Sequence, residues 1–173
     1  MNTINTLFHN IEADKISDNF IDLIHNQWML ITAGDPKGYN TMTASWGSVG
    51  ALWNKAIAIC FIRPTRYTYE FANANDIFTL SFFPNEYRKI LNFCGSRSGK
   101  ETDKIAATGL RPVVTINQGI TYEQARLCIE CRKIYTDDLK PGNFLQPEID
   151  MNLYPRKDYH RMYIGEILDC YAR

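Results

Sequence analysis

The sequence has no apolar run long enough to cross a membrane. Its longest purely apolar stretch is Ala56–Ile62, whereas a membrane-spanning helix needs about 20 such residues. Residues 1–20 mix Asn, Asp, Glu and Lys with isolated apolar residues, so they lack the positive start and apolar core of a secretory signal. We therefore expect a cytoplasmic protein with no membrane partner.

Neither sign of charge is in excess. Lys and Arg together number 19, Asp and Glu together number 19, and the formal net charge is zero. General nucleic-acid binding needs a net basic surface that releases counterions, so nucleic acid is not an expected partner. A local basic pocket for one phosphate remains compatible with this composition.

Motifs of several large enzyme classes are missing. The chain contains neither the G-x-G-x-x-G fingerprint of dinucleotide-binding folds nor the G-x-S-x-G elbow of α/β-hydrolases. Gly95–Lys100 resembles a phosphate-binding P-loop, but the spacing between its glycines is one residue short. Glu101 also stands where that motif needs Ser or Thr. A Rossmann dehydrogenase, a hydrolase and a P-loop enzyme are therefore poorly supported.

The cysteines do not form a recognisable metal or redox set. There are five, an odd number that favours reduced thiols in a chain without an export signal. Cys128 and Cys131 form a C-x-x-C pair inside a predicted strand, where residues three apart point to opposite faces. No second Cys pair or His pair completes a zinc site. We predict structural thiols and no metal.

What the sequence does have is a globular composition with a β-type pattern. The chain of 173 residues is 45% apolar and 22% charged, which fits one domain, residues 1–173, with a substantial core. Turn residues and apolar runs predict strands over 28–32, 39–45, 56–62, 77–83, 113–116, 119–122, 125–135 and 159–171. Residues 11–26 are predicted to form a modest helix or an irregular entry segment. Short helices are predicted over 66–73 and 86–93, the second of them stopped by Gly95, and another short helix is predicted to end near Gly109.

The remaining segments are predicted to be irregular. Residues 49–54 form an exposed apolar loop, which fits an interface, a ligand edge or simply a packed connection. Residues 137–155 form the longest loop, and loops of that length are usually functional or lie across a partner. Gly165 predicts a bulge or a close contact in the last strand. Strands outnumber long helices without βαβ alternation, so the fold class is mainly β, an antiparallel barrel with helical insertions.

The stretch Gly38–Ser48 is unusual because it is rich in small hydroxyl residues and poor in charge. Its strand end at Thr43–Ser48 has little bulk, so backbone N–H and C=O groups there can approach a flat polar ligand. A strand followed by a flexible turn explains the same pattern without any ligand.

Three cations are candidates for an anion site: Arg63, Arg66 and Lys100. Thr65 is predicted to cap a short helix whose first N–H groups face a phosphate, with an arginine adding a charged contact. The alternative is a capped surface helix with solvated arginines. His160 shares a strand face with Met162 and Ile164, so a packed histidine is its default interpretation.

Four blocks, taken in order, resemble the flavin reductase-like, FMN-binding split-barrel proteins, most closely the flavoredoxin-type branch. The blocks are Asn40–Trp46, Arg63–Thr68, Asn92–Lys104 and Asp158–Glu166. The resemblance implies an antiparallel Greek-key split barrel that forms a homodimer and holds FMN in a groove near the subunit interface. It also implies hydride transfer from NAD(P)H to the flavin, with the flavin rather than a side chain carrying the chemistry.

The resemblance assigns cofactor-binding roles by position. Residues Thr43–Gly47 would contact the polar edge of the flavin ring, Arg63 to Tyr67 would hold the phosphate, and Trp46 or His160 would border the ring. Ser98 and Lys100 would close over the cofactor, and His160 would either hydrogen-bond it or help to neutralise its reduced form. The full set implied is Asn40, Met42, Thr43, Ala44, Ser45, Trp46, Gly47, Arg63, Thr65, Arg66, Tyr67, Thr68, Ser96, Ser98, Gly99, Lys100 and His160.

Two other functions remain open from the sequence. The chain fits a flavoredoxin-like FMN electron carrier that passes electrons between redox-protein partners without nicotinamide turnover. It also fits a β-barrel binding module without flavin, since no catalytic triad or metal set is present.

Overall fold

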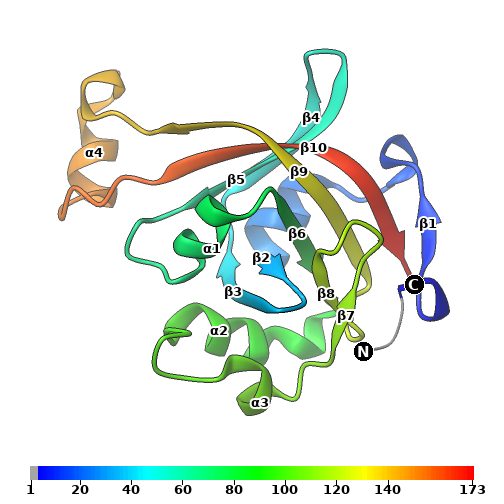
Figure 1. Cartoon of the computed structure of the whole chain (residues 1–173). Coiled ribbons are helices and arrows are strands. Elements are labelled where there is room, and N and C mark those ends of the chain that lie inside the picture. The colour runs from blue at the N-terminus through cyan, green and yellow to red at the C-terminus, as the bar shows by residue number, and fades with distance from the viewer. Residues whose placement is uncertain (1–3) are drawn as a thin grey trace.

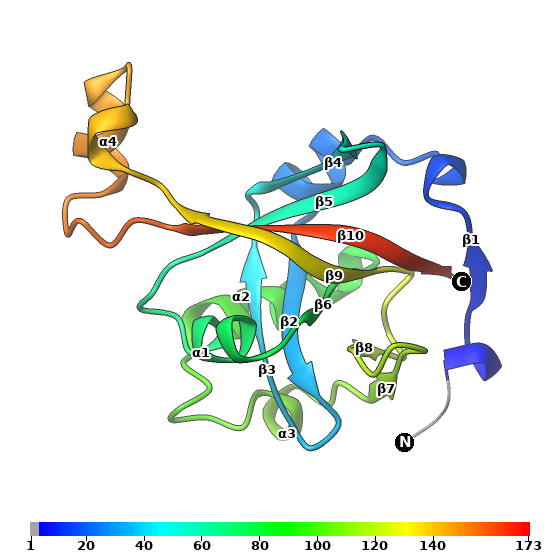
Figure 2. The ribbon, with the colours of Figure 1, turned by 45° about the horizontal axis from the view of Figure 1, so that its top comes forward.

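A computed structural model describes residues 4–173 of the chain. Its centre is an antiparallel sheet in the order β3-β2-β6-β9-β10-β5-β4, with β1 paired to β10, and β7 and β8 form a separate hairpin (Figures 1 and 2). The strands are β1 (His9–Ile11), β2 (Met29–Asp35), β3 (Gly38–Ala44), β4 (Gly47–Leu52), β5 (Lys55–Ile62), β6 (Ile77–Phe82), β7 (Pro112–Val114), β8 (Ile120–Tyr122), β9 (Leu127–Asp138) and β10 (Arg161–Ala172). Every pairing is antiparallel, which confirms the predicted strand-rich class.

The helices are short and lie outside the sheet. They are α1 (Thr68–Ala74), α2 (Arg88–Ser96), α3 (Lys104–Thr108) and α4 (Pro147–Leu153). Single 3₁₀ turns occur at Ile4–Thr6, Ala13–Lys15, Asn85–Tyr87 and Pro141–Asn143, and a π-helical segment at Asp22–Gln27. Within residues 4–173, no helix is long and apolar enough to span a membrane.

The sheet is open between its two end strands, β3 and β4. Strands β3 and β4 are its two end strands, yet they follow each other in the chain and are joined only by Ser45 and Trp46. In the β2–β3 hairpin that leads to this link, Gly34 lies near the end of β2, opposite Tyr39, and has a φ of +114°. A Cβ at Gly34 would lie 2.3 Å from the carbonyl oxygen of Gly38, so only glycine fits there.

Two apolar clusters lie on opposite faces of the sheet. One contains Ile31, Leu80, Ile129 and Cys131, and the other, under α2 and the β7–β8 hairpin, contains Leu30, Leu91, Val113 and Cys128. The alternation of strand side chains separates the two cysteines of the C-x-x-C pair in this way. The prediction that their sulfurs do not converge is confirmed, and burial raises the pKa of both thiols.

Two predicted segments can be compared with the structure. Residues 11–26, predicted as a modest helix or an irregular entry segment, contain the end of β1, a 3₁₀ turn and the π-helical segment, and His9–Ile11 pairs with the end of β10. The long loop predicted over 137–155 contains α4, which projects from the body on the extended ends of β9 and β10 (Figure 2). Pro147 at the first turn of α4 favours helix, since it needs no N–H donor there.

Two central predictions also needed correction. The segment predicted as an apolar loop over 49–54 belongs to a β4–β5 hairpin whose turn residues, Trp53 and Asn54, both have positive φ. Gly95 does not end the second helix but lies inside α2. Its Cβ position is 3.3 Å from the Cβ of Thr43, so a glycine lets α2 pack closely against β3.

Candidate functional site

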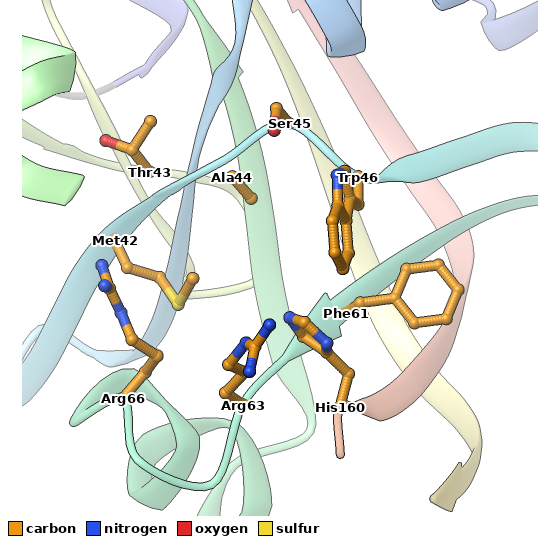
Figure 3. A pocket seen from close by; sticks show the side chains of 9 residues that line it. All are labelled: Met42, Thr43, Ala44, Ser45, Trp46, Phe61, Arg63, Arg66 and His160. Carbon is orange, nitrogen blue, oxygen red and sulfur yellow. The ribbon is translucent and has the colours of Figure 1, made fainter. Parts of the chain in front are cut away.

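A hollow of about 220 Å³ lies at the link between β3 and β4 (Figure 3). It is formed by the end of β3, the end of β5, the turn before α1 and the residue before β10. The residues that line it are Met42, Thr43, Ala44, Ser45, Trp46, Phe61, Arg63, Arg66 and His160. Apart from Phe61, all of these were predicted from the sequence, and the fold brings them together from three separate parts of the chain.

One wall of this hollow is aromatic. The rings of Trp46 and His160 lie 5.0 Å apart, and the side chains of both are directed into the space beside Phe61 (Figure 3). Trp46 is 38% exposed although it is a large apolar residue. Ser45 and Trp46 also lie outside the β2–β3 and β4–β5 pairings, so their peptide groups are not used by the sheet. This end of the site is suited to a flat ring with polar edges.

His160 is neutral at physiological pH. Burial lowers its pKa to about 4, with the nearby positive charge of Arg63 adding to the effect and Asp158 opposing it. Its Nδ1 is 2.8 Å from the hydroxyl of Tyr154, with which it shares a hydrogen bond. Of the two roles left open for His160, a neutral hydrogen-bonding group fits this environment, whereas a positive charge does not.

Arg63 is held by protein groups rather than left free for a phosphate. Its guanidinium donates to Oδ1 of Asp158 at 2.7 Å and to the carbonyl of Leu153 at 2.8 Å, and it lies 4.9 Å from the centre of the Tyr154 ring. The same contact lowers the pKa of Asp158. Arg63 therefore ties the end of α4 and the start of β10 to the ring end of the site.

A second hollow of about 160 Å³ neighbours the first and shares Met42 and Arg66 with it. It is lined by cations and hydroxyl groups: Thr65, Arg66, Tyr67, Thr68, Ser96, Arg97, Ser98, Gly99 and Lys104, beside Met42. Burial lowers the pKa of Arg66, and no acidic partner of Arg66 is found among residues 4–173. We refer to the two neighbouring hollows together as the elongated site, with an aromatic end and a basic end.

The helix next to the basic end differs from the prediction. It begins at Thr68 rather than Arg66, and Thr65 does not cap it. Thr68 is fully buried, and its Oγ accepts a 2.7 Å hydrogen bond from Nδ2 of Asn40, which ties α1 to β3. Asn40 thus supports the site from behind.

Three predicted residues do not line either hollow: Asn40, Gly47 and Lys100. The ammonium of Lys100 is 2.6 Å from Oε1 of Glu70 and 5.2 Å from the Tyr67 ring centre. Lys100 lines another groove with Tyr39 and Phe71, which shares Tyr67, Gly99 and Lys104 with the second hollow. Gly47 borders a third hollow on the other side of Trp46, with Phe20 and Ile24.

Sequence reasoning assigned no role to Lys104, although it was part of a resembling block. This side chain is only 5% exposed, and its ammonium donates to the carbonyls of Thr41 at 2.7 Å and Cys94 at 2.9 Å. Burial lowers its pKa to about 8, with the charge of Arg66 contributing. No pattern in the sequence separates this lysine from a surface lysine, because its burial depends on how α3 packs against β3.

Gly99 controls the shape of the basic end. A Cβ built on it would lie 2.0 Å from Oδ1 of Asn40 and 3.1 Å from the Tyr67 ring. Gly99→Ala is therefore expected to push the 96–100 loop outward and to weaken binding of a phosphate-bearing ligand about tenfold, while Gly142→Ala, which meets no atom within 4 Å, leaves it unchanged. Equilibrium ligand titration of the two variants tests this, and equal affinities would show that the loop is not packed against Asn40.

Comparison with known proteins agrees with this geometry. Residues 21–173 match the family model described as the flavin reductase like domain. No curated protein sequence matches the chain at a significant level.

Solved structures show the fold. Flavoredoxin from Methanosarcina acetivorans is 21% identical with a TM-score of 0.65, covering 85% of this chain and 68% of its own. An FMN-binding protein from Thermus thermophilus with bound p-hydroxybenzaldehyde is 17% identical with a TM-score of 0.68, covering 95% and 82%. The Streptomyces globisporus C-1027 NADH:FAD oxidoreductase, in complex with NAD and FAD fragments, is 14% identical with a TM-score of 0.63, covering 85% and 74%.

These similarities confirm the predicted split-barrel fold, with its mostly antiparallel sheet left open between β3 and β4. The family model spans most of the chain, including both hollows and the link between the end strands. This protein belongs to the flavin reductase-like domain family.

Proposed function

We propose that this protein binds FMN in the elongated site, with the ring beside Trp46 and the phosphate at Arg66. The observation that supports this most strongly is that the aromatic hollow and the basic hollow are neighbours sharing Met42 and Arg66, because FMN likewise has a flat ring at one end and a dianion at the other. Arginine, serine and threonine donors in the second hollow suit a phosphate, which accepts several charge-assisted hydrogen bonds.

The residues of the ring end then take distinct roles. Peptide groups of Ser45 and Trp46 would hydrogen-bond the polar edge of the ring, and the indole of Trp46 would cover part of its face. Arg66 would favour negative charge on the reduced cofactor, since it lines the first hollow (Figure 3), whereas the charge of Arg63 is largely offset by its ion pair with Asp158. His160, which is neutral, contributes a hydrogen bond rather than a charge.

Bound FMN would supply the redox chemistry, accepting a hydride from NAD(P)H and passing electrons to an acceptor. We propose this oxidoreductase activity as the function. The alternative is an electron carrier. The similarity to flavoredoxins favours the carrier, whereas the similarity to an NADH:FAD oxidoreductase favours hydride transfer.

One experiment separates these functions. FMN is added to the purified protein without oxygen, followed by NADH and then NADPH, and the flavin absorbance band is recorded. Tight binding with rapid bleaching is the result expected for the oxidoreductase. Binding without bleaching by either nicotinamide would establish the carrier, and no binding would support the flavin-free module.

We also propose that two copies of the chain associate. Large apolar side chains are exposed on the β4–β5 hairpin, at Leu52 and Trp53, and on α4, at Met151 and Leu153. Both elements project from the body of the fold (Figure 1). Contact with a second copy would cover them. Sedimentation is expected to give twice the monomer mass of 20.0 kDa, whereas a concentration-independent monomer would contradict the proposal.

A further inference from the structure

The basic end of the site contains two kinds of cation. Arg66 and Arg97 reach it on long side chains from the turn before α1 and from the residue after α2. Lys104 instead lies beneath it, 5% exposed, between β3 and the end of α2. A buried ammonium is costly unless its charge and its donors are satisfied.

Lys104 is incompletely satisfied by the protein. An ammonium has three N–H donors, and two of them are used by the carbonyls of Thr41 and Cys94. No carboxylate forms an ion pair with Lys104 in the described residues 4–173. The positive charge of Arg66 has the same sign and lowers the pKa of Lys104 further.

Lys133 provides a comparison within the same chain. Its ammonium also donates to backbone carbonyls, those of Ala72 at 2.7 Å, Asn73 at 3.2 Å and Asn75 at 2.9 Å. These three acceptors use all three donors, and Lys133 borders none of the hollows described above. The ammonium of Lys104 is likewise bound to backbone carbonyls, but among the described residues one of its three N–H donors has no acceptor. Lys104 also borders the basic hollow.

We infer that Lys104 is a ligand of the FMN phosphate and that the protein holds it in place for this role. The phosphate would accept the remaining N–H of Lys104 and compensate its charge. This inference rests on the proposed function. The two carbonyls fix the ammonium beforehand, so little side-chain freedom is lost on binding. Riboflavin, which has the same ring but no phosphate, gains nothing from this lysine.

The inference makes FMN binding depend on pH in a defined direction. Without ligand the pKa of Lys104 is about 8, so the lysine loses its charge as the pH rises above that value. A phosphate dianion favours the charged form, so binding above pH 8 takes up a proton and becomes weaker as the pH rises. Below pH 8 the lysine is already charged, and this dependence disappears.

Other titratable groups surround Lys104 and have to be separated from it. They are Cys94 on α2, Tyr39 on β3, Asp103 before α3, and Arg66 and Arg97 beside the hollow. Burial raises the pKa of both Cys94 and Tyr39 above their ordinary values, so they titrate at higher pH than Lys104. Ring titration of the flavin is common to FMN and riboflavin and cancels in their affinity ratio.

The test measures the ratio of FMN to riboflavin affinity by fluorescence titration in wild-type protein, Lys104→Met and Lys133→Met. We expect Lys104→Met to lower the ratio about ten- to a hundredfold, the range of one charged hydrogen bond, and Lys133→Met to leave it unchanged. In the wild type, the ratio is expected to fall about tenfold between pH 7.5 and 9.5. Calorimetry in buffers of different ionisation enthalpy should show proton uptake with FMN at pH 9 but not with riboflavin.

The outcomes separate the inference from the function on which it rests. If wild-type protein binds FMN but the ratio is unchanged in Lys104→Met and flat with pH, the inference is wrong and the proposed FMN site stands. If neither flavin binds the wild type, the proposed function fails and the inference with it. Should Lys104→Met not fold, the wild-type pH profile and proton uptake decide the question alone.

Discussion

Replacing Arg66 by alanine is expected to weaken FMN binding by about 1.5–3 kcal/mol, or about 10–150-fold in the dissociation constant. Arg66 is the one charged residue that borders both hollows, and it is half-buried without an acidic partner in the described part of the chain. Its removal takes away a charge-assisted contact to the phosphate while leaving no protein carboxylate unpaired. The measurement is an FMN fluorescence titration at fixed salt.

Two further variants make this result specific. Arg132→Ala removes an exposed arginine on β9 that borders neither hollow, and it should leave the dissociation constant unchanged. Arg66→Lys keeps the charge but loses the planar pair of donors, so an intermediate affinity is expected. An unchanged FMN affinity in Arg66→Ala would remove this residue from the site and place the phosphate elsewhere.

The second large effect concerns stability. Glu130 on β9 is fully buried and accepts hydrogen bonds from the hydroxyls of Thr115 and Tyr171, the peptide N–H of Gly119 and the side chain of Asn117. Glu130→Ala leaves several of these buried donors without an acceptor. We expect the free energy of unfolding to fall by about 2–5 kcal/mol, because each unsatisfied buried donor costs about 1–3 kcal/mol.

Urea unfolding measures this change, with Glu148→Ala as the control. Glu148 is exposed on α4, and its removal should alter the free energy by less than about 0.5 kcal/mol. A comparably small change in Glu130→Ala would mean that water satisfies the donors around the β7–β8 hairpin. Because Glu130 lines neither hollow, the effect of its removal on the FMN affinity of the folded protein should be small.

The parts of the fold that could be predicted are those set by local chemistry. Gly165 predicted a bulge or close contact, and the register of β10 against β9 does shift there, with a Cβ position 2.6 Å from the Phe78 ring. The β2–β3 turn and the opposite faces of Cys128 and Cys131 follow equally from turn residues and strand alternation. In each case the signal lies within a few residues of the feature.

What could not be predicted depends on packing between distant segments. Lys104 and Lys100 are four residues apart with no sequence pattern to distinguish them, yet one is buried between β3 and α2 and the other is paired with Glu70 on the surface. Arg63 was expected at the phosphate, but Asp158, 95 residues later, holds it at the ring end. The buried acceptor Glu130 is likewise defined by a hairpin that precedes it in the chain.

The most direct test of this account is an equilibrium titration of the full-length wild-type protein with FMN. Saturable binding of one FMN per chain, tighter than riboflavin and accompanied by quenching of Trp46 fluorescence, is the result that the neighbouring aromatic and basic hollows predict. Absence of saturable binding, or equal affinity for FMN and riboflavin, would contradict the assignment of the basic hollow as the phosphate site.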